Sequence, residues 1–290
     1  MNGILIIDKP AGWTSHDVVA KLRGIYQERR IGHTGTLDPM ATGVLVVFLG
    51  RATRAVQLCE NDSKEYIAGL QLGTVTNTQD TTGEILETHP ADVEDSRLQA
   101  VLQQFTGPIT QIPPMYSAIK VGGKKLYELA RKGETVERKP RSITIHELEL
   151  LARSGDQCQL RVGCSKGTYV RTLCHDIGQA LGCGGCMSSL RRTAAGHFTL
   201  EDAVTLEQVQ AAREEGRHLE LLRPVDFLFR HLPALTLTAK QERLCRNGNA
   251  FACDAPDGEY RVYSADGSFL MLGRCQSGSM QTIKSFFEVN

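Results

Sequence analysis

The sequence predicts an α+β protein with a second, smaller and mostly-β unit at its C-terminal end. Apolar strand-like runs follow one another in antiparallel-looking hairpins with helices between them, without the strict strand–helix alternation of a doubly wound sheet. Near residues 232–238 the chain changes to one short helix and several strands around Asp-Gly turns. We therefore expect residues 1–230 to form a large domain and residues 231–290 a small one.

Composition narrows the class of protein. Hydrophobic residues make up 41% of the 290-residue chain, so it can bury a full core without disulfides. Its 33 Lys/Arg balance its 33 Asp/Glu, which weakly disfavours a general polyanion binder but permits a local basic patch. The opening "MNGILIIDKP" is no secretory signal, and no apolar run approaches the length of a membrane span. We expect a cytoplasmic protein whose nine cysteines are reduced, and a monomer because no coiled-coil pattern or large apolar stripe is present.

The first elements read as strand, helix, loop and strand. "GILIIDKP" has the length of a buried strand and ends at Pro10. "TSHDVVAKLRGIY" carries an apolar stripe at helical spacing, and Thr14 or Ser15 can cap this helix. "GVLVVFLG" predicts a second buried strand, and the small-residue loop before it contains a single acid, Asp38.

The middle of the chain continues this mixture. "KEYIAGLQLG" alternates as a strand does, and "TNTQDTTGEI" predicts a polar turn. "DSRLQAVLQQFTG" predicts a helix that ends at Gly107. "RSITIHELEL" and "QCQLRVGC" predict two strands before another helix, and "TLEQVQAAREEG" predicts a further capped helix.

Residues 108–142 differ from their surroundings. They contain several prolines, a glycine pair and a short predicted helix. Between Lys120 and Arg141, eight Lys/Arg and three Glu give a local net charge of +5 in an otherwise neutral protein. The segment is either a solvated surface hairpin or a site that binds a polyanion, and charge alone leaves both readings open.

Asp38 is the sharpest candidate for chemistry. An Asp before a proline is usually a turn former that accepts bonds from nearby backbone N–H groups. Here the small neighbouring residues leave room for a substrate, and the apolar strand behind the loop lowers the local dielectric. A carboxylate in such a place needs a partner. Arg171 in "CSKGTYVRTL" is the candidate, on a strand-like run that would place it on one face with Tyr169; the alternative is an arginine on a solvent face.

Other chemical signals are weaker or absent. Tyr66 and Tyr116 taken singly are more often core residues, but beside a basic segment they suggest stacking on unpaired bases. Cys183 and Cys186 in "CGGC" have the spacing of a metal or redox site, although a helix end with small apolar thiols explains them better. Phosphate-binding glycine loops and the G-x-S-x-G motif are missing, and no signal for a cofactor is present.

Five segments in succession resemble the motifs of one enzyme family. They are "LIIDKPAGWTSHDVV", "GHTGTLDPMATGVLVVFLG", "KEYIAGLQLG…TQDTTG", "PPMYSAIKVGGKKLYELARKG" and "CSKGTYVRTL". In this order they resemble the tRNA pseudouridine-55 synthases of the TruB type, and the tail resembles a reduced PUA domain, which binds RNA. The resemblance implies a pseudouridine-synthase fold, with a central mixed, mainly antiparallel sheet flanked by helices.

The resemblance also implies a reaction without metal or cofactor, on one uridine of the tRNA T-loop. The N1–C1′ bond breaks, the uracil turns, and C5 bonds to C1′. One carboxylate then either adds to C1′ or removes a C2′ proton, and the sequence does not choose between these. A glycosidase would need two acids, so a lone Asp38 favours rearrangement over hydrolysis.

Carried over by motif, the residue roles are as follows. Asp38 is the catalytic carboxylate, with Arg171 as its ion-pair partner. Tyr66 stacks on the target base and helps to remove the C5 proton. Three further residues contact the RNA around the base: Tyr169 and Leu190 as pocket walls, and His33 as a wedge in the T-loop. Lys124 and Lys125 belong to an RNA-gripping insertion at about residues 108–142.

Three rival functions stay open at this point. The first is a guide-RNA-dependent synthase of the same catalytic fold, as in archaeal and eukaryotic relatives, which works with protein partners. The second is a non-catalytic RNA-binding protein, which would not need Asp38. The third is a nucleoside or glycoside hydrolase, which would release free base.

Overall fold

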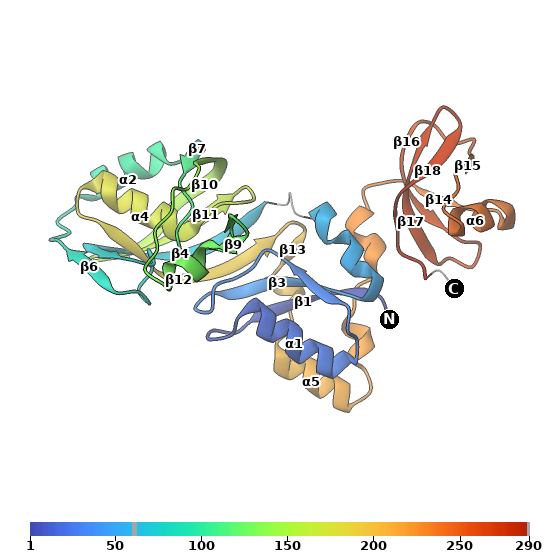
Figure 1. Cartoon of the computed structure of the whole chain (residues 1–290), viewed down its shortest axis with the longest axis horizontal. Coiled ribbons are helices and arrows are strands. Elements are labelled where there is room, and N and C mark those ends of the chain that lie inside the picture. The colour runs from blue at the N-terminus through green and yellow to red at the C-terminus, as the bar shows by residue number, and fades with distance from the viewer. Residues whose placement is uncertain (60–62, 289–290) are drawn as a thin grey trace.

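The computed structural model describes residues 1–59 and 63–288. One large mixed sheet runs through the body of the molecule, and a separate small sheet lies at one end (Figure 1). The large sheet has the strand order β1-β3-β12-β4-β11-β10-β7, with β2 and β13 as additional partners. This arrangement confirms the predicted central mixed, mainly antiparallel sheet with a C-terminal β unit. No helix within the described residues is both long and apolar enough to span a bilayer.

The N-terminal part of the sheet is formed by buried strands and covered by two helices. β1 and β2 both pair antiparallel with β3, whose burial along almost its whole length explains its continuous apolar sequence. Helices α1 and α5 pack their apolar stripes on this part of the sheet. Thr14 caps α1 and Thr205 caps α5, each through a capping box. The elements are β1 (Gly3–Lys9), α1 (Ser15–Tyr26), β2 (Ile31–Thr34), β3 (Thr42–Leu49) and α5 (Leu206–Glu214).

The second part of the sheet is antiparallel throughout and packs against α2 and α4. The predicted helix end at Gly107 was wrong, because α2 ends at Gln104 and Gly107 begins β7 with a positive φ of 98°. The elements are β4 (Lys64–Leu72), α2 (Asp95–Gln104), β7 (Gly107–Gln111), β10 (Arg141–Ser154), β11 (Gln157–Cys164), α4 (Val170–Leu181) and β12 (Gly185–Ala195).

The two parts of the sheet meet along a short parallel seam. Only two residue pairs join β12 to β3, Arg191 with Thr42 and Arg192 with Gly43. Gly43 has φ of 100°, and a Cβ on it would lie 2.1 Å from the carbonyl oxygen of Arg192. The close approach of the two strands therefore requires glycine here. The Asp38 loop precedes β3 directly, so the seam positions it.

Several short elements complete the body. The predicted polar turn lies inside a hairpin of β5 (Thr74–Thr76) and β6 (Ile85–Thr88). The 108–142 segment contains a second hairpin of β8 (Lys120–Val121) and β9 (Lys124–Lys125), followed by the expected short helix α3 (Leu126–Ala130). The remaining elements are β13 (Phe198–Thr199) and the 3₁₀ helices η1 (Gly50–Cys59), η2 (Leu200–Asp202), η3 (His218–Leu221) and η4 (Val225–Phe229).

The C-terminal unit has a core of its own and is also packed against the body. Its sheet has the order β14-β16-β17-β18-β15 beside one helix. Phe229 of the body packs with Phe269 and Phe286 of the tail, in an apolar cluster that also contains Ala52 of η1. The two units therefore share a hydrophobic contact. The elements are β14 (Ala234–Thr236), α6 (Ala239–Arg246), β15 (Phe251–Ala252), β16 (Gly258–Tyr263), β17 (Phe269–Gln276) and β18 (Ser279–Ser285).

Candidate active site

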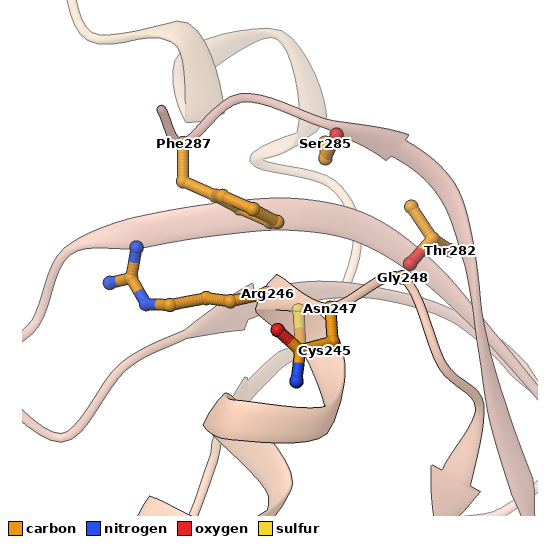
Figure 2. A pocket seen from close by; sticks show the side chains of 7 residues that line it. All are labelled: Cys245, Arg246, Asn247, Gly248, Thr282, Ser285 and Phe287. Carbon is orange, nitrogen blue, oxygen red and sulfur yellow. The ribbon is translucent and has the colours of Figure 1, made fainter. Parts of the chain in front are cut away.

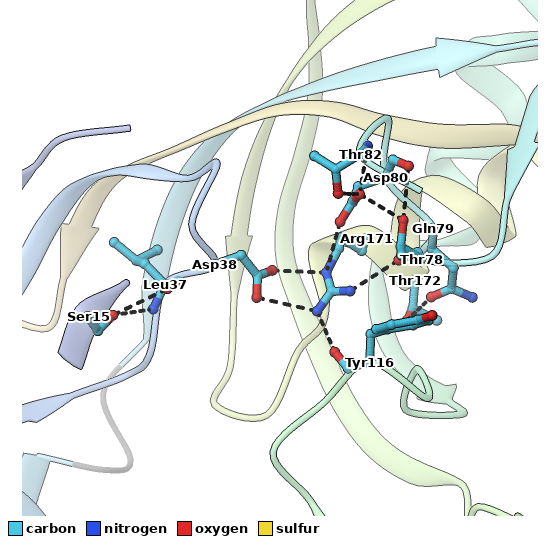
Figure 3. Close-up of polar contacts among 10 residues, drawn as sticks. All are labelled: Ser15, Leu37, Asp38, Thr78, Gln79, Asp80, Thr82, Tyr116, Arg171 and Thr172. Atoms are coloured by element: carbon cyan, nitrogen blue, oxygen red, sulfur yellow. Dashed lines mark hydrogen bonds and ion pairs between the residues drawn. The ribbon is translucent and has the colours of Figure 1, made fainter. Parts of the chain in front are cut away.

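The Asp38 loop is fastened to the start of α1. The backbone N–H of Leu37 donates to Ser15 Oγ (2.9 Å), and the Ser15 hydroxyl donates back to the Leu37 carbonyl (3.3 Å). Ser15 is fully buried at the first turn of α1. This reciprocal pair holds the residue before Asp38 in place (Figure 3).

Lys9 fastens the other side of the same loop. Its buried ammonium donates to three backbone carbonyls, those of Pro10 (2.9 Å), Trp13 (2.6 Å) and Pro39 (3.3 Å). Burial lowers the pKa of Lys9 to about 8. The ammonium thus ties the end of β1 to the residue that follows Asp38.

Asp38 and Arg171 form the predicted ion pair. Arg171 Nε lies 2.9 Å from Asp38 Oδ2, and Arg171 Nη2 donates to Asp38 Oδ1 at 3.4 Å. The arginine is 6% exposed, whereas the Asp38 side chain keeps 37% of its surface open. A two-point contact fixes the plane of the carboxylate. The buried partner therefore orients the acid, while the acid itself stays accessible to a substrate.

The strand-like setting predicted for Arg171 was wrong. Val170 begins α4, and Tyr169 is its N-cap, so residues 169 and 171 do not share a strand face. The strand β11 ends at Cys164, and Gly167 with φ of 80° turns the chain. Buried apolar residues then recur at helical spacing along α4, which outweighs the β-branched appearance of "TYVRT".

The other donors of Arg171 are also used. Nη1 donates to the carbonyl of Thr78 (3.1 Å), and Nη2 donates to the carbonyl of Tyr116 (2.9 Å). Tyr116 lies at the root of the 108–142 segment, so the arginine joins three loops that are distant in sequence (Figure 3). Tyr116 itself is half-buried, and its contact with the arginine is made by its backbone.

A second acid, Asp80, lies near the same guanidinium. Its Oδ2 is 3.8 Å from Arg171 Nε, so the expectation of a lone acid was wrong. Its Oδ1 accepts from the Thr78 hydroxyl (2.8 Å) and from the backbone N–H (3.0 Å) and hydroxyl (2.5 Å) of Thr82. Asp80 is 5% exposed. Threonines on both sides of an Asp in "TQDTTG" are the sequence signal for such a turn.

Because its bonds are local and its side chain is buried, Asp80 offers no free acid for hydrolysis. Asp38 and Asp80 approach the same guanidinium from two different loops, and Asp38 makes the closer contact. The loop is held further by the Thr172 hydroxyl, which donates to Gln79 Oε1 (2.8 Å). Gln79 has a positive φ of 64°, so the turn is locally strained.

Tyr66 and Leu190 lie on the neighbouring strands. Tyr66 is 7% exposed on β4, and Leu190 is 9% exposed on β12. Burial raises the pKa of Tyr66, and the nearby charge of Arg192 opposes this effect. Tyr169 is placed by Gln111, whose amide donates to the Tyr169 carbonyl (3.3 Å) and accepts from the Tyr169 N–H (3.1 Å).

His33 lies on β2, five residues before Asp38, with its ring edge-on to that of His16 (5.9 Å between ring centres). Burial, aided by His16 and Arg192, lowers the pKa of His33 to about 4. The imidazole is therefore neutral near pH 7. A neutral ring suits a contact made by shape or stacking.

Lys124 and Lys125 lie apart from these groups, on the β8–β9 hairpin. Lys125 Nζ donates to the hydroxyl of Tyr127 (3.2 Å), and Arg131 lies over the same ring. The segment is joined to the ion pair through the Tyr116 carbonyl.

Two further features lie outside this site. No three His, Cys, Asp or Glu side chains in the described part of the chain are grouped to hold a metal ion, and Cys183 and Cys186 are both buried. A hollow of about 460 Å³ lies in the tail (Figure 2). Beside it the guanidinium of Arg246 lies over the ring of Phe287, 5.4 Å from its centre. The other lining residues are Cys245, Asn247, Gly248, Thr282 and Ser285.

Known proteins resemble this chain along its whole length. Residues 23–170 match the N-terminal domain of the TruB family of pseudouridylate synthases, and residues 171–230 match a tRNA pseudouridylate synthase B C-terminal domain. The tRNA pseudouridine synthase B of Aromatoleum aromaticum is 47% identical over 95% of this chain and 89% of its own length. The protein of the same name from Stutzerimonas stutzeri is 46% identical, over 94% and 91%.

Solved structures agree with these sequence matches. A Cbf5-Nop10-Gar1 complex contains a chain with a TM-score of 0.74 and 28% identity, over 99% of this chain and 85% of that one. An H/ACA RNP bound to a substrate RNA containing 2′-deoxyuridine contains another, with a TM-score of 0.73 and 26% identity, over 99% and 86%.

Proposed function

The chain belongs to the TruB family of pseudouridylate synthases, and on this premise we propose that it converts uridine-55 in the T-loop of tRNA to pseudouridine. It acts as an isomerase, as a single cytoplasmic chain, and its own residues supply all the chemical groups. The observation that carries the proposal is the Asp38–Arg171 pair, in which an accessible carboxylate is held in two-point contact by a buried guanidinium.

The reaction explains why one oriented carboxylate is needed. Breaking the N1–C1′ bond leaves the ribose short of electrons, and a carboxylate beside it can add to C1′ or take the C2′ proton. Asp38 fits either route, because its side chain is partly open to a substrate and because contacts from both of its oxygens to the guanidinium fix its orientation. Arg171 keeps the acid in the reactive orientation, so its role is positioning.

The target uridine must leave the base stack of its loop, which costs a few kcal/mol. Tyr66 provides an aromatic face for the extruded base. Tyr169 and Leu190 form the walls of the pocket. His33 takes the space that the base leaves, and its neutral ring fits that role.

Binding of the T-arm comes from other groups. The insertion holds exposed basic side chains such as Lys124, and the half-buried Lys125 lies beside it on the hairpin. These side chains contact the phosphate backbone. The tail is a PUA-like unit that contacts the same tRNA. In this proposal, residues 1–230 carry out catalysis, and residues 231–290 provide an additional surface that binds the tRNA.

A direct experiment tests this function. The purified chain is incubated with unmodified tRNA, and pseudouridine is mapped by chemical labelling at single-nucleotide resolution. We expect conversion at one T-loop uridine, and none with Asp38→Asn. Free uracil among the products would indicate a hydrolase, and binding without conversion would indicate an RNA-binding protein.

A guide-RNA-dependent synthase is the second candidate, favoured by the similarity to the chain in an H/ACA RNP structure. Conversion of bare tRNA by the chain alone separates the two. A requirement for a second RNA or for protein partners would overturn the first proposal in favour of this one.

A further inference from the structure

Arg192 lies between the loop that carries Asp38 and the strand that carries Tyr66. It is the largest side chain among the fully buried residues of the described chain, with no exposed surface. On β12 it stands directly opposite Tyr66 of β4. Residues directly opposite each other in an antiparallel pair project to the same face of the sheet. The guanidinium and the phenol therefore belong to one buried layer.

The hydrogen bonds of Arg192 are incomplete. Nε donates to the Val44 carbonyl (2.6 Å), and Nη2 donates to the carbonyl of Gly35 in the loop that leads to Asp38 (2.9 Å). Nη1 is buried and makes no hydrogen bond of full geometry within the described residues, although the guanidinium is close enough to the Tyr66 phenol to oppose the rise in its pKa by hydrogen bonding. No described carboxylate pairs with this cation.

This state is unusual for a buried arginine. A buried charge normally has an acid beside it, and a buried N–H group normally has an acceptor. The buried Arg171 follows that rule, since it pairs with Asp38. Even Arg191, whose side chain is half-exposed, pairs with Asp8 (2.8 Å). The unused N–H of Arg192 thus calls for a functional reason.

Glycine keeps the space beside this N–H open. A Cβ on Gly35 would lie 3.1 Å from Nη1, and the φ of Gly35 is 66°. One side chain thus bonds to the loop that carries Asp38 and also faces Tyr66. The two groups that act on the ribose and on the base are joined through Arg192.

The proposed reaction has a step that needs such a group. After C5 bonds to C1′, C5 still carries its hydrogen and must lose it. A neutral phenol is a poor acceptor for that proton, and burial disfavours the phenolate. The charged or titratable groups that act on Tyr66 are Arg192 from β12, Cys164 from β11 and Asp38 from the loop. Arg192 is the cation among these three.

We propose that Arg192 is a positioning residue that directs its unused N–H to the hydroxyl oxygen of Tyr66 and thereby enables Tyr66 to accept the C5 proton. This inference rests on the proposed function. The C5–H bond breaks, its proton goes to the phenolate oxygen, and its electron pair forms the C5=C6 bond. The electron pair of the former C6=N1 bond takes a proton from water at N1, and the phenol later returns its proton to water, so the isomerisation balances.

The test compares two adjacent arginines. Arg192→Met removes the buried cation, and Arg191→Met is the control, since that residue pairs with Asp8 and its side chain is 43% exposed. Single turnovers are measured on T-arm RNA with either hydrogen or deuterium at C5 of the target uridine. For Arg192→Met we expect a rate about 10²–10⁴-fold lower, with a larger isotope effect than wild type because C5–H cleavage becomes limiting.

Two readouts separate this role from a structural one. Without the cation, the limb of the rate profile that requires deprotonated Tyr66 should move to higher pH. In a Tyr66→Phe background, Arg192→Met should add little, because both changes remove the same step. Displacement of the Asp38 loop would slow glycosidic cleavage instead, without raising the isotope effect or moving that limb.

The outcomes are decisive in each case. The inference would be overturned if Arg192→Met were slow but kept the wild-type isotope effect and the wild-type position of the limb of the pH–rate profile. If that variant fails to fold, Arg192→Lys, which keeps a cation but shortens the reach, must still raise the isotope effect, and a wild-type value would overturn it. If the wild-type chain forms no pseudouridine, the proposed function falls and the inference falls with it.

Discussion

The Asp38–Arg171 ion pair of the active site and the basic insertion use charge in opposite ways. In the active site, Arg171 is buried and its donors are directed at the Asp38 carboxylate and two backbone carbonyls. In the insertion, Lys124, Arg131 and Lys132 are exposed. Chemistry needs a charge held in one orientation, whereas binding to a phosphate backbone uses several exposed cations that release its counterions. Neutralising a charge of the active-site ion pair should therefore reduce turnover, and neutralising charges of the insertion should reduce affinity for tRNA.

The largest effect is expected for Asp38→Asn. The amide keeps the size of the side chain but can neither add to C1′ nor take a proton, so turnover should fall by at least about 10⁴-fold. The dissociation constant for tRNA should stay within about threefold, since phosphate and stacking contacts lie elsewhere. Single-turnover pseudouridine formation and filter binding measure the two. Activity within tenfold of wild type would remove Asp38 from the mechanism.

Arg171→Met should come next. This change removes the cation that Asp38 and Asp80 share. It also leaves the carbonyls of Thr78 and Tyr116 without these donors. Removing one partner of a buried pair costs about 3–5 kcal/mol of unfolding free energy, and because Asp38 is partly open we expect a loss of at most that size. We expect catalysis to fall about 10²–10³-fold. Urea unfolding and single-turnover rates measure these losses. Arg171→Lys should recover part of the stability but little of the two-point orientation, and full activity of either variant would contradict the assignment.

The insertion should show the reverse pattern. Replacing Lys124, Lys125, Arg131 and Lys132 by Gln should weaken tRNA binding, and each lost phosphate contact should reduce the log–log salt slope by about 0.7–0.9. The rate at saturating tRNA should change much less. As the matched control, Glu134→Gln with Glu137→Gln in the same segment should leave binding unchanged or strengthen it. A wild-type salt slope for the fourfold variant would place the phosphate contacts elsewhere.

His33 sharpens the comparison, since it is a neutral group on β2, five residues before Asp38. If it works as a wedge through shape, His33→Phe should keep about tenfold more activity than His33→Ala, on the scale of one stacking contact. A general base works through its lone pair, so both variants would then be equally poor. Single turnovers on folded tRNA and on an isolated T-arm stem-loop distinguish the two roles.

The smallest effect concerns the stability of the free protein. The pKa of His33 is about 4 when folded and about 6.5 when unfolded, so the unfolded chain binds more protons between these values. Above pH 6.5, protonation of His33 therefore does not reduce the free energy of unfolding. As the pH falls toward 4, the unfolded chain takes up the proton first, and the free energy of unfolding is about 2 kcal/mol lower at pH 5. Urea unfolding at pH 7 and pH 5 should show this loss, and His33→Phe should reduce it. An equal loss in both proteins would mean that other groups cause it.

Sequence patterns determined much of this protein because they depend on local physics. Continuous apolar runs predicted β1 and β3, since strands buried on both faces have no polar side. The capping residues of α1 and α5 could be read from the sequence, because a cap bonds within its own turn. The small-residue loop with Asp38, and the need for a cation beside it, were likewise evident.

Only the tertiary structure decided which distant groups meet. Asp80 lies beside Arg171 because the turn of the β5–β6 hairpin is bridged to β12 at Met187, and no spacing in the sequence encodes that approach. Arg171 lies in the first turn of a helix because burial along α4 outweighs local strand propensity. Arg192 faces Tyr66 through the register of β12 with β4, a long-range pairing. Side-chain type and local period are written in the chain, but the partners of a buried charge depend on how the sheet closes.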